Sequence, residues 1–142
     1  MARHVLVDTG PVVALLDRRD RQHEWAKREI ARLHDPLLTC EAVISEVFFL
    51  LSGVQRGTTT FVGLLRDGLV RVSPKFSFRD QHAQVLRHLE RYGSVPMSFA
   101  DACLVRMSEL DRDSIVFTTD RDFLTYRRNR RQAIPLISPF DF

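Results

Sequence analysis

The feature that most constrains the fold of this chain is a short apolar run that ends in polar residues, Val5-Leu6-Val7-Asp8-Thr9-Gly10. The run lacks the alternation of a strand exposed on one side, which is typical of a strand buried on both faces of a parallel sheet. Asp8 then lies at the carboxyl end of the strand, where open α/β sheets bind their ligands. Because a helix is expected to begin near Pro11, capping of that helix is an equal alternative role for Asp8.

Helices and short strands alternate along the rest of the chain. Further helices are expected over 21–34, 41–52, 57–67, 80–92 and 98–110, and further strands over 37–39, 69–72, 115–118 and 134–137. This alternation predicts an α/β fold with a mainly parallel central sheet. Pro135 favours an edge position for the last strand. No linker or internal repeat separates these elements, so residues 1–142 are expected to form a single domain.

The composition is that of an ordinary soluble globular protein, with 44% hydrophobic residues among 142. No apolar run approaches the length of a signal-peptide core or a membrane span, and no membrane partner is expected. Cys40 and Cys103 form no metal-binding or CxxC pattern, which favours a reduced, cytoplasmic setting. The net charge of +3 comes almost wholly from arginine, whose planar fork suits phosphate. High arginine content can also reflect genome composition, so this alone is weak evidence for nucleic acid.

Four acidic residues from distant segments are expected at one edge of the sheet. Asp8 and Asp120 directly follow buried strands, Asp101 opens a helix, and Glu46 lies about a turn and a half into the helix after the second strand. Ser98 and Asp101 also resemble a capping box, which gives Asp101 a purely structural alternative. Carboxylates gathered without a cation would raise each other's pKa. Such an oxygen-rich cluster suits Mg²⁺ or Mn²⁺.

The segments that contain these acids resemble the four acidic motifs of the PIN domain. They are Val5-Leu6-Val7-Asp8-Thr9, Ser45-Glu46, Phe99-Ala100-Asp101-Ala102 and Thr118-Thr119-Asp120-Arg121-Asp122-Phe123. Their order and spacing are similar to those of the toxin ribonucleases of bacterial VapBC toxin–antitoxin pairs, over nearly the whole chain. The resemblance implies a PIN-like three-layer α/β/α sandwich and a Mg²⁺- or Mn²⁺-dependent endoribonuclease. It also implies a homodimer that acts on RNA and is inhibited by a small antitoxin protein.

The resemblance assigns roles to individual residues. It implies Asp8, Glu46, Asp101 and Asp120 as catalytic residues, with Asp8, Asp101 and Asp120 as the metal ligands. Thr9, Thr119 and Asp122 are expected to support them. Either carboxylate of Asp120-Arg121-Asp122 could face the metal, and Asp120 is favoured because it follows the strand directly. Glu41 is interpreted as a helix-start acid that interacts with the helix dipole.

A run of arginines follows the last acid. Arg121, Arg127, Arg128, Arg130 and Arg131 could contact RNA phosphates and strengthen binding in a salt-dependent way. A solvated loop is an equally good interpretation of the same residues. The sequence leaves both open.

Other families fit the acids less well. A receiver domain needs a lysine after a late strand, and Lys27 and Lys75 are badly placed. Haloacid dehalogenase-like phosphatases need a second aspartate where this chain has Gly10. The remaining alternative is a non-catalytic PIN-like module that binds RNA or a protein, and the presence of all four acids argues against it.

The helix expected over 41–52 is apolar on several sides. Val47, Phe48, Leu50 and Leu51 spread over more than one face, which predicts an exposed patch and a two-fold dimer contact. The alternative is that these side chains complete the core of the domain. An antitoxin arginine placed among the four acids could compete with the metal through bidentate pairs.

Overall fold

The computed structural model describes residues 3–140 and has a parallel sheet at its centre. The strands of this sheet are β1 (His4–Val7), β2 (Leu37–Thr39), β3 (Val70–Val72), β4 (Ser114–Phe117) and β7 (Leu136–Ile137). Their order across the sheet is β3-β2-β1-β4-β7, and every neighbouring pair is parallel. The predicted α/β fold with a parallel sheet is therefore confirmed, and the last strand does lie at an edge.

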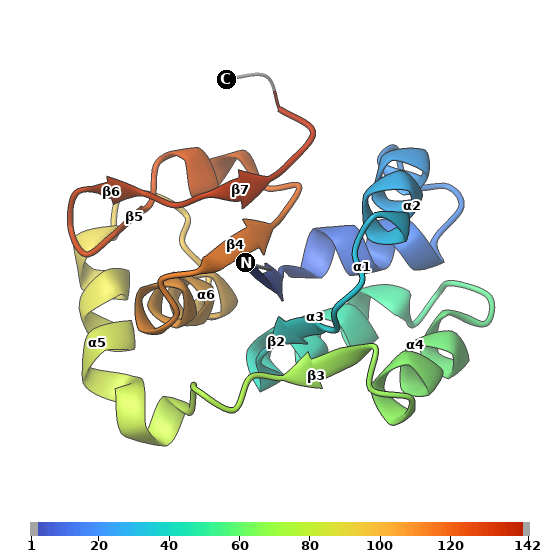
Figure 1. Ribbon diagram of the computed structural model, residues 1–142, viewed down its shortest axis with the longest axis horizontal. Coiled ribbons are helices and arrows are strands. Elements are labelled where there is room, and N and C mark those ends of the chain that lie inside the picture. The colour runs from blue at the N-terminus through green and yellow to red at the C-terminus, as the bar shows by residue number, and fades with distance from the viewer. Residues whose placement is uncertain (1–2, 141–142) are drawn as a thin grey trace.

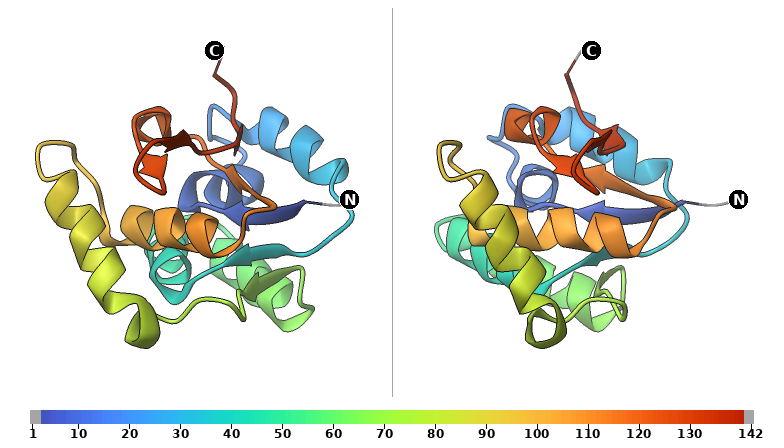
Figure 2. Two further views of the ribbon diagram at one scale, coloured as in Figure 1. Left: turned by 60° about the vertical axis from the view of Figure 1, so that its left-hand side comes forward. Right: turned by 90° about the vertical axis from the view of Figure 1, so that its left-hand side faces the viewer.

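Helices flank both faces of this sheet (Figures 1 and 2). The helices are α1 (Thr9–Leu16), α2 (His23–Ala31), α3 (Glu41–Leu51), α4 (Gly57–Arg66), α5 (Phe78–Arg91) and α6 (Phe99–Leu110). α5 and α6 lie on one side of the sheet, and α1, α2 and α4 lie on the other. α3 contacts α1, α4 and α6. Between residues 3 and 140, no helix has the length and apolar character needed to cross a membrane.

The two central strands supply much of the core. Val7 of β1 and Val116 and Phe117 of β4 have no exposed surface, and Leu6 has 1%. This burial on both faces is what the unbroken apolar run predicts. Because β1 and β4 are parallel neighbours in register from His4 to Val7, the residues that follow them lie at the same edge of the sheet.

The segment after β4 is more regular than a solvated loop, which is one of the two interpretations of its arginines. It forms a 3₁₀ turn, η1 (Arg121–Leu124), and a small antiparallel hairpin of β5 (Arg127–Arg128) and β6 (Gln132–Ala133). Asn129 and Arg130, between these strands, both have positive φ, at 51° and 73°. Glycine usually fills such positions, and its absence here left the sequence without a hairpin signal.

Helix α3 corrects the prediction of a broad exposed apolar patch. Val47 and Leu51 have no exposed surface, and Phe48 packs edge-on against Phe61. These three side chains complete the core, so the alternative interpretation holds for them. Leu50 is 51% exposed and Phe49, which the sequence analysis did not single out, is 77% exposed. The exposed part of the helix is therefore narrower than expected.

Candidate metal centre

Three aspartates meet at the carboxyl edge of the sheet. Asp8, Asp101 and Asp120 each offer a carboxylate oxygen, and these oxygens lie within 4.8 Å of one another. Asp8 follows β1, Asp101 lies in the first turn of α6, and Asp120 precedes η1. Asp8 and Asp101 are 95% buried, while Asp120 is partly exposed. The fold therefore brings Asp8 together with two aspartates that lie more than ninety positions further along the chain.

Asp8 is both a helix cap and a member of this group. It is the N-cap of α1, and its Oδ1 accepts a hydrogen bond of 2.8 Å from the Thr9 amide. Its Oδ2 accepts a bond of 2.7 Å from the Thr118 hydroxyl, which in turn accepts 3.0 Å from the Asp120 amide. Thr118 thus links two of the three aspartates. The supporting hydroxyls predicted from the sequence are those of Thr9 and Thr119, and Thr118 was missed, although it is the first residue after β4.

Asp101 is fixed by the capping box and by a tyrosine. The Ser98 hydroxyl accepts the Asp101 amide at 3.0 Å, and Asp101 Oδ2 accepts the Ser98 amide at 3.4 Å. The same Oδ2 accepts a hydrogen bond of 2.9 Å from the hydroxyl of Tyr126, which is fully buried. Burial and the Asp101 charge raise the pKa of Tyr126 above its usual range, so this hydroxyl keeps its proton and donates. No sequence pattern pointed to Tyr126, because it follows a 3₁₀ turn whose direction is set by packing.

The electrostatics of the group are dominated by burial and by repulsion between its carboxylates. Burial, with the charge of Asp101, raises the pKa of Asp8 to about 7. Burial also raises the pKa of Asp101 to about 6, with a contribution from Asp120 and against the hydrogen bond from Tyr126. No lysine, arginine or histidine is among the described residues that line the surrounding pocket. A cation would therefore relieve a repulsion that the chain itself leaves uncompensated.

Two further carboxylates lie in the same pocket, which has a volume of about 370 Å³ and which we call the acid pocket. Glu46 is outside the group of three, and its Oε2 accepts a hydrogen bond of 2.9 Å from the Thr9 hydroxyl. Thr9, which follows Asp8 in the chain, thus holds the side chain of Glu46 on α3. Asp20, in the turn between α1 and α2, also lines the pocket.

The loop that bears Asp120 lies very close to the start of α1. A Cβ atom on Gly10 would lie 2.0 Å from Thr119 Oγ1, so a side chain there would force Thr119 to shift. Thr119 lines the pocket, whereas the Asp122 carboxylate is not part of the group of three. The Asp122 amide donates to Asp120 Oδ1 at 2.9 Å. Asp122 therefore orients Asp120 through its backbone.

The arginine run after Asp120 is not a uniform basic surface. Arg128 is 95% buried and donates to the Ser108 and Arg112 carbonyls, at 3.3 and 3.5 Å. Arg127 donates to the carbonyls of residues 124–126. These bonds hold both side chains against the fold, and burial makes Arg128 inaccessible to a phosphate. Arg121, Arg130 and Arg131 are exposed, and Arg121 stacks over Phe140 at 4.5 Å.

These features define a class of protein. The family model of the PIN domain matches residues 5–129, so the chain belongs to the PIN-domain family. Among solved structures, it is similar to VapC20 of Mycobacterium tuberculosis, described as a toxin that cleaves the sarcin–ricin loop. The match has a TM-score of 0.72 and 24% sequence identity, and covers 83% of this chain and 91% of that one. At this identity the likeness establishes a shared fold. No curated protein sequence matches the chain.

Proposed function

We propose that this chain is a Mg²⁺- or Mn²⁺-dependent endoribonuclease and the toxin of a type II toxin–antitoxin pair. The observation that carries the proposal is the group of Asp8, Asp101 and Asp120 at the carboxyl edge of a PIN-domain sheet. Several carboxylates with no balancing cation form a site for a hard divalent metal. The description of VapC20 as an RNA-cleaving toxin supports the choice of substrate and of biological role.

The residues present fit such a metal. Asp8, Asp101 and Asp120 would hold it, since their oxygens converge and the raised pKa values of Asp8 and Asp101 reflect an unmet demand for positive charge. When bound, Mg²⁺ or Mn²⁺ supplies Lewis-acid chemistry, which activates water and neutralises charge on the phosphodiester and its leaving oxygen.

The chain's own groups would orient this chemistry. Thr118 fixes Asp8, and Tyr126 and Ser98 fix Asp101, so the carboxylates are held in place before substrate arrives. Glu46 has one oxygen bonded to Thr9 and the other free of any bond to a described residue. In this proposal that oxygen accepts the proton of the attacking water, which makes Glu46 the general base.

A matched pair of variants tests the proposal and the choice between Asp120 and Asp122. With purified protein, single-stranded RNA and millimolar Mn²⁺ or Mg²⁺, we expect cleavage that EDTA abolishes. Asp120→Asn should lower the rate by more than about 100-fold, because even partners of metal ligands cost 10–100-fold when lost. Asp122→Asn keeps the backbone amide that orients Asp120 and should stay within about tenfold of wild type. RNA binding without any cleavage in either metal would contradict the proposal and favour a non-catalytic module.

We also propose a homodimer and a small antitoxin partner. Phe49 and Leu50 project from α3, and Leu50 lines the acid pocket as well. A two-fold contact through these side chains would bury apolar surface beside the site. Light scattering at tens of micromolar should report a dimer, and Phe49→Ser/Leu50→Ser should shift it toward monomer. A wild-type monomer under these conditions would remove the dimer from the proposal.

A further inference from the structure

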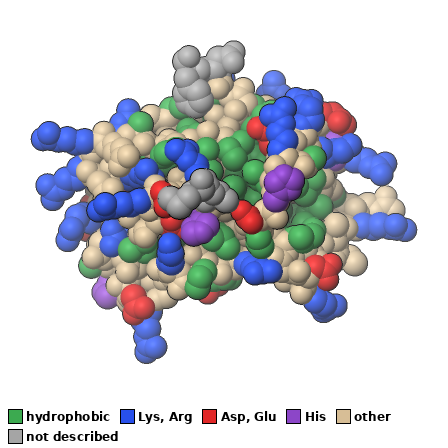
Figure 3. All heavy atoms as spheres, viewed as in Figure 1, with side chains coloured by type: hydrophobic (Ala, Val, Ile, Leu, Met, Phe, Trp, Pro, Cys, Tyr) green, Lys and Arg blue, Asp and Glu red, His purple; other side chains and the backbone are tan. Residues whose placement is uncertain are grey.

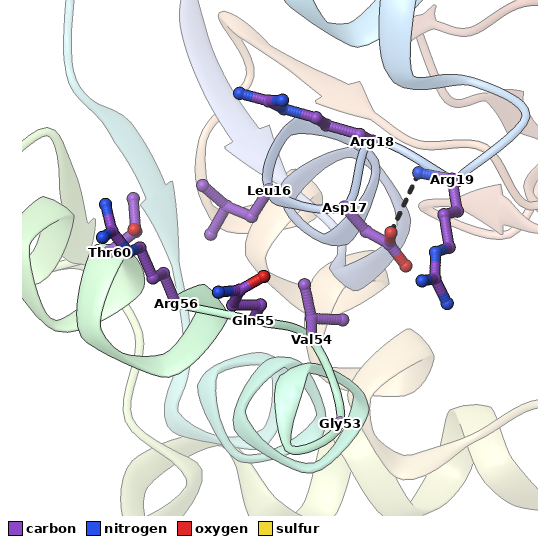
Figure 4. Close-up of a pocket in the computed structure, with 9 residues that line it drawn as sticks. All are labelled: Leu16, Asp17, Arg18, Arg19, Gly53, Val54, Gln55, Arg56 and Thr60. Carbon is purple, nitrogen blue, oxygen red and sulfur yellow. Dashed lines mark hydrogen bonds between the residues drawn. The ribbon is translucent and has the colours of Figure 1, made fainter.

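A second groove lies at the other end of the helices that form the acid pocket. It has a volume of about 620 Å³ and is lined by the end of α1 and the residues that follow it, by the α3–α4 connection and by the first turn of α4 (Figure 4). The lining residues are Leu16, Asp17, Arg18, Arg19, Gly53, Val54, Gln55, Arg56 and Thr60. In Figure 4, Arg18 lies at the top of the view, Arg56 at the left and Arg19 at the right, with Leu16 and Val54 between them. We call this feature the arginine groove.

The arginine groove carries positive charge that the fold does not use. Arg18, Arg19 and Arg56 are exposed, and none has a side-chain hydrogen bond or ion pair with another residue in the described range 3–140. Asp17 is the one acid among the lining residues, and its Oδ1 accepts the Arg19 amide at 3.0 Å. The lining therefore has a net charge of +2 and three free guanidinium groups. This contrasts with Arg127 and Arg128, whose guanidinium groups are bonded to carbonyls.

The arginine groove and the acid pocket are joined by the same two helices. At one end, the Thr9 hydroxyl of α1 bonds Glu46 of α3 at 2.9 Å. At the other end, Leu16 of α1 and Gly53, just beyond α3, line the arginine groove. Leu16 is seven residues after Thr9, and Gly53 is seven residues after Glu46. At 1.5 Å per helical residue, this places the groove about 10 Å from the acids. The chain between Asp17 and Asp20 contributes to both cavities, since Asp20 lines the acid pocket.

We propose that the arginine groove binds backbone phosphates of the RNA on one side of the cleaved bond. This inference rests on the proposed function, because it places the RNA across the acid pocket. The acid pocket has no cationic side chain among its described lining residues, so phosphates near it need attraction from elsewhere on the chain. Arginine forks hold phosphate oxygens in bidentate pairs, and the arginine groove offers three of them next to the site. Basic side chains project all around the face shown in Figure 3, so it is position rather than charge that selects these three.

The test compares two variants with equal loss of charge. The groove variant is Arg18→Gln/Arg19→Gln/Arg56→Asn, in which asparagine tolerates the left-handed backbone of Arg56 (φ 62°). The control variant is Arg28→Gln/Arg66→Gln/Arg79→Gln, which removes three exposed arginines from α2, α4 and α5. Binding of a fluorescently labelled 12-nucleotide single-stranded RNA is measured by anisotropy in EDTA, where the proposed cleavage is off. The measurement is repeated from 50 to 200 mM salt.

The groove variant should bind RNA at least about tenfold more weakly at 50 mM salt. Each lost phosphate contact lowers the salt slope of single-strand binding by about 0.7, so three lower it by about 2. The control variant should keep the wild-type slope. If the groove variant does not fold, as judged by circular dichroism, Arg18→Gln/Arg19→Gln replaces it, with an expected fall of about 1.4 in slope.

The outcomes separate this inference from the proposed function. A wild-type slope in the groove variant overturns the inference, even if the protein cleaves RNA. Groove-dependent RNA binding by a protein that cleaves nothing in Mg²⁺ or Mn²⁺ supports the arginine groove while the proposed activity fails. Binding of an oligoglutamate peptide that depends on the three arginines, with RNA binding unaffected, also overturns the inference and assigns the arginine groove to an acidic protein segment.

Discussion

Two acidic sites in this protein, the aspartate group and Glu109, have opposite electrostatics. At the carboxyl edge of the sheet, burial and neighbouring carboxylates raise the pKa of Asp8 to about 7. At Glu109 on α6, burial also acts to raise the pKa, but hydrogen bonds from His88, at 2.8 Å, and from the Asn129 amide, at 2.7 Å, bring it to about 2. Arg106 adds a contact of 3.2 Å to Glu109. Hydrogen bonds and a cation compensate the charge of Glu109, whereas the aspartate group lacks nearby positive charge. This marks the aspartate group as a binding site.

The largest predicted difference between the two groups is in cleavage. Asp8→Asn should lower the rate of RNA cleavage by more than about 100-fold, through loss of a metal ligand, while its stability without metal stays equal or rises as repulsion is removed. Glu109→Gln should have the opposite pattern, with cleavage kept and stability lowered. It keeps cleavage per folded molecule and lowers the free energy of unfolding by about 2–3 kcal/mol, because charged hydrogen bonds are lost.

Cleavage assays and urea unfolding of the two variants, each beside wild type, measure both quantities. If Glu109→Gln abolishes cleavage in a folded protein, the assignment of a purely structural role to Glu109 is wrong. The comparison also fails if Asp8→Asn cleaves at the wild-type rate, since Asp8 would then be a helix cap only.

Metal binding should stabilise the folded protein through the aspartate group and not through Glu109. A ligand at 100 times its dissociation constant stabilises the native state by about 2.7 kcal/mol, which corresponds to a rise in Tm on the order of 5–10 °C for a domain of this size. We expect this rise with millimolar Mn²⁺ in wild type and in Glu109→Gln. Calorimetry of Asp8→Asn/Asp101→Asn should show much less, and an equal rise in that variant would place the ion elsewhere.

The smallest predicted effect is the dependence of folding stability on pH. Asp8 and Asp101 have raised pKa values in the folded, metal-free protein, so between about pH 4 and 7 the folded state binds more protons than the unfolded state. Stability should therefore fall as pH rises through this window. The lowered pKa of Glu109 acts in the opposite sense and only below its unfolded value, where stability is lost as pH falls toward 2.

Thermal unfolding in EDTA should give a Tm a few degrees lower at pH 7.5 than at pH 5. Asp8→Asn should flatten this slope, and saturating Mn²⁺ should reverse it, because the metal binds the ionised carboxylates. A Tm in EDTA that rises over the same interval would show that Asp8 and Asp101 are ionised without cost in the folded protein.

The central part of this molecule could be predicted from sequence because each signal there is local. The unbroken run before Asp8 predicts a buried strand, and parallel strands must end at one edge, which places Asp8 and Asp120 together. The capping box of Ser98 and Asp101 is likewise a local pattern, and the structure confirms it.

The rest depends on tertiary packing that no local pattern encodes. Tyr126 reaches Asp101 only because η1 and the hairpin turn it inward. Arg128 is buried while Arg18 and Arg19 are free, and all three look alike in the sequence. Gly10 reads as a helix-start residue, and its close approach to Thr119 is visible only in three dimensions.

The position of β4 in the sheet also determines when the acid group can form during synthesis. β4 lies beside β1 at the centre of the sheet, yet it is separated from β1 by most of the chain. A nascent chain shorter than about 120 residues has Asp8, Glu46 and even Asp101, but lacks Asp120 and the strand that positions it. Domains fold as their segments leave the ribosome, and contacts this distant in sequence close last. The ribosome that makes the protein therefore finishes most of its work before the acid group exists.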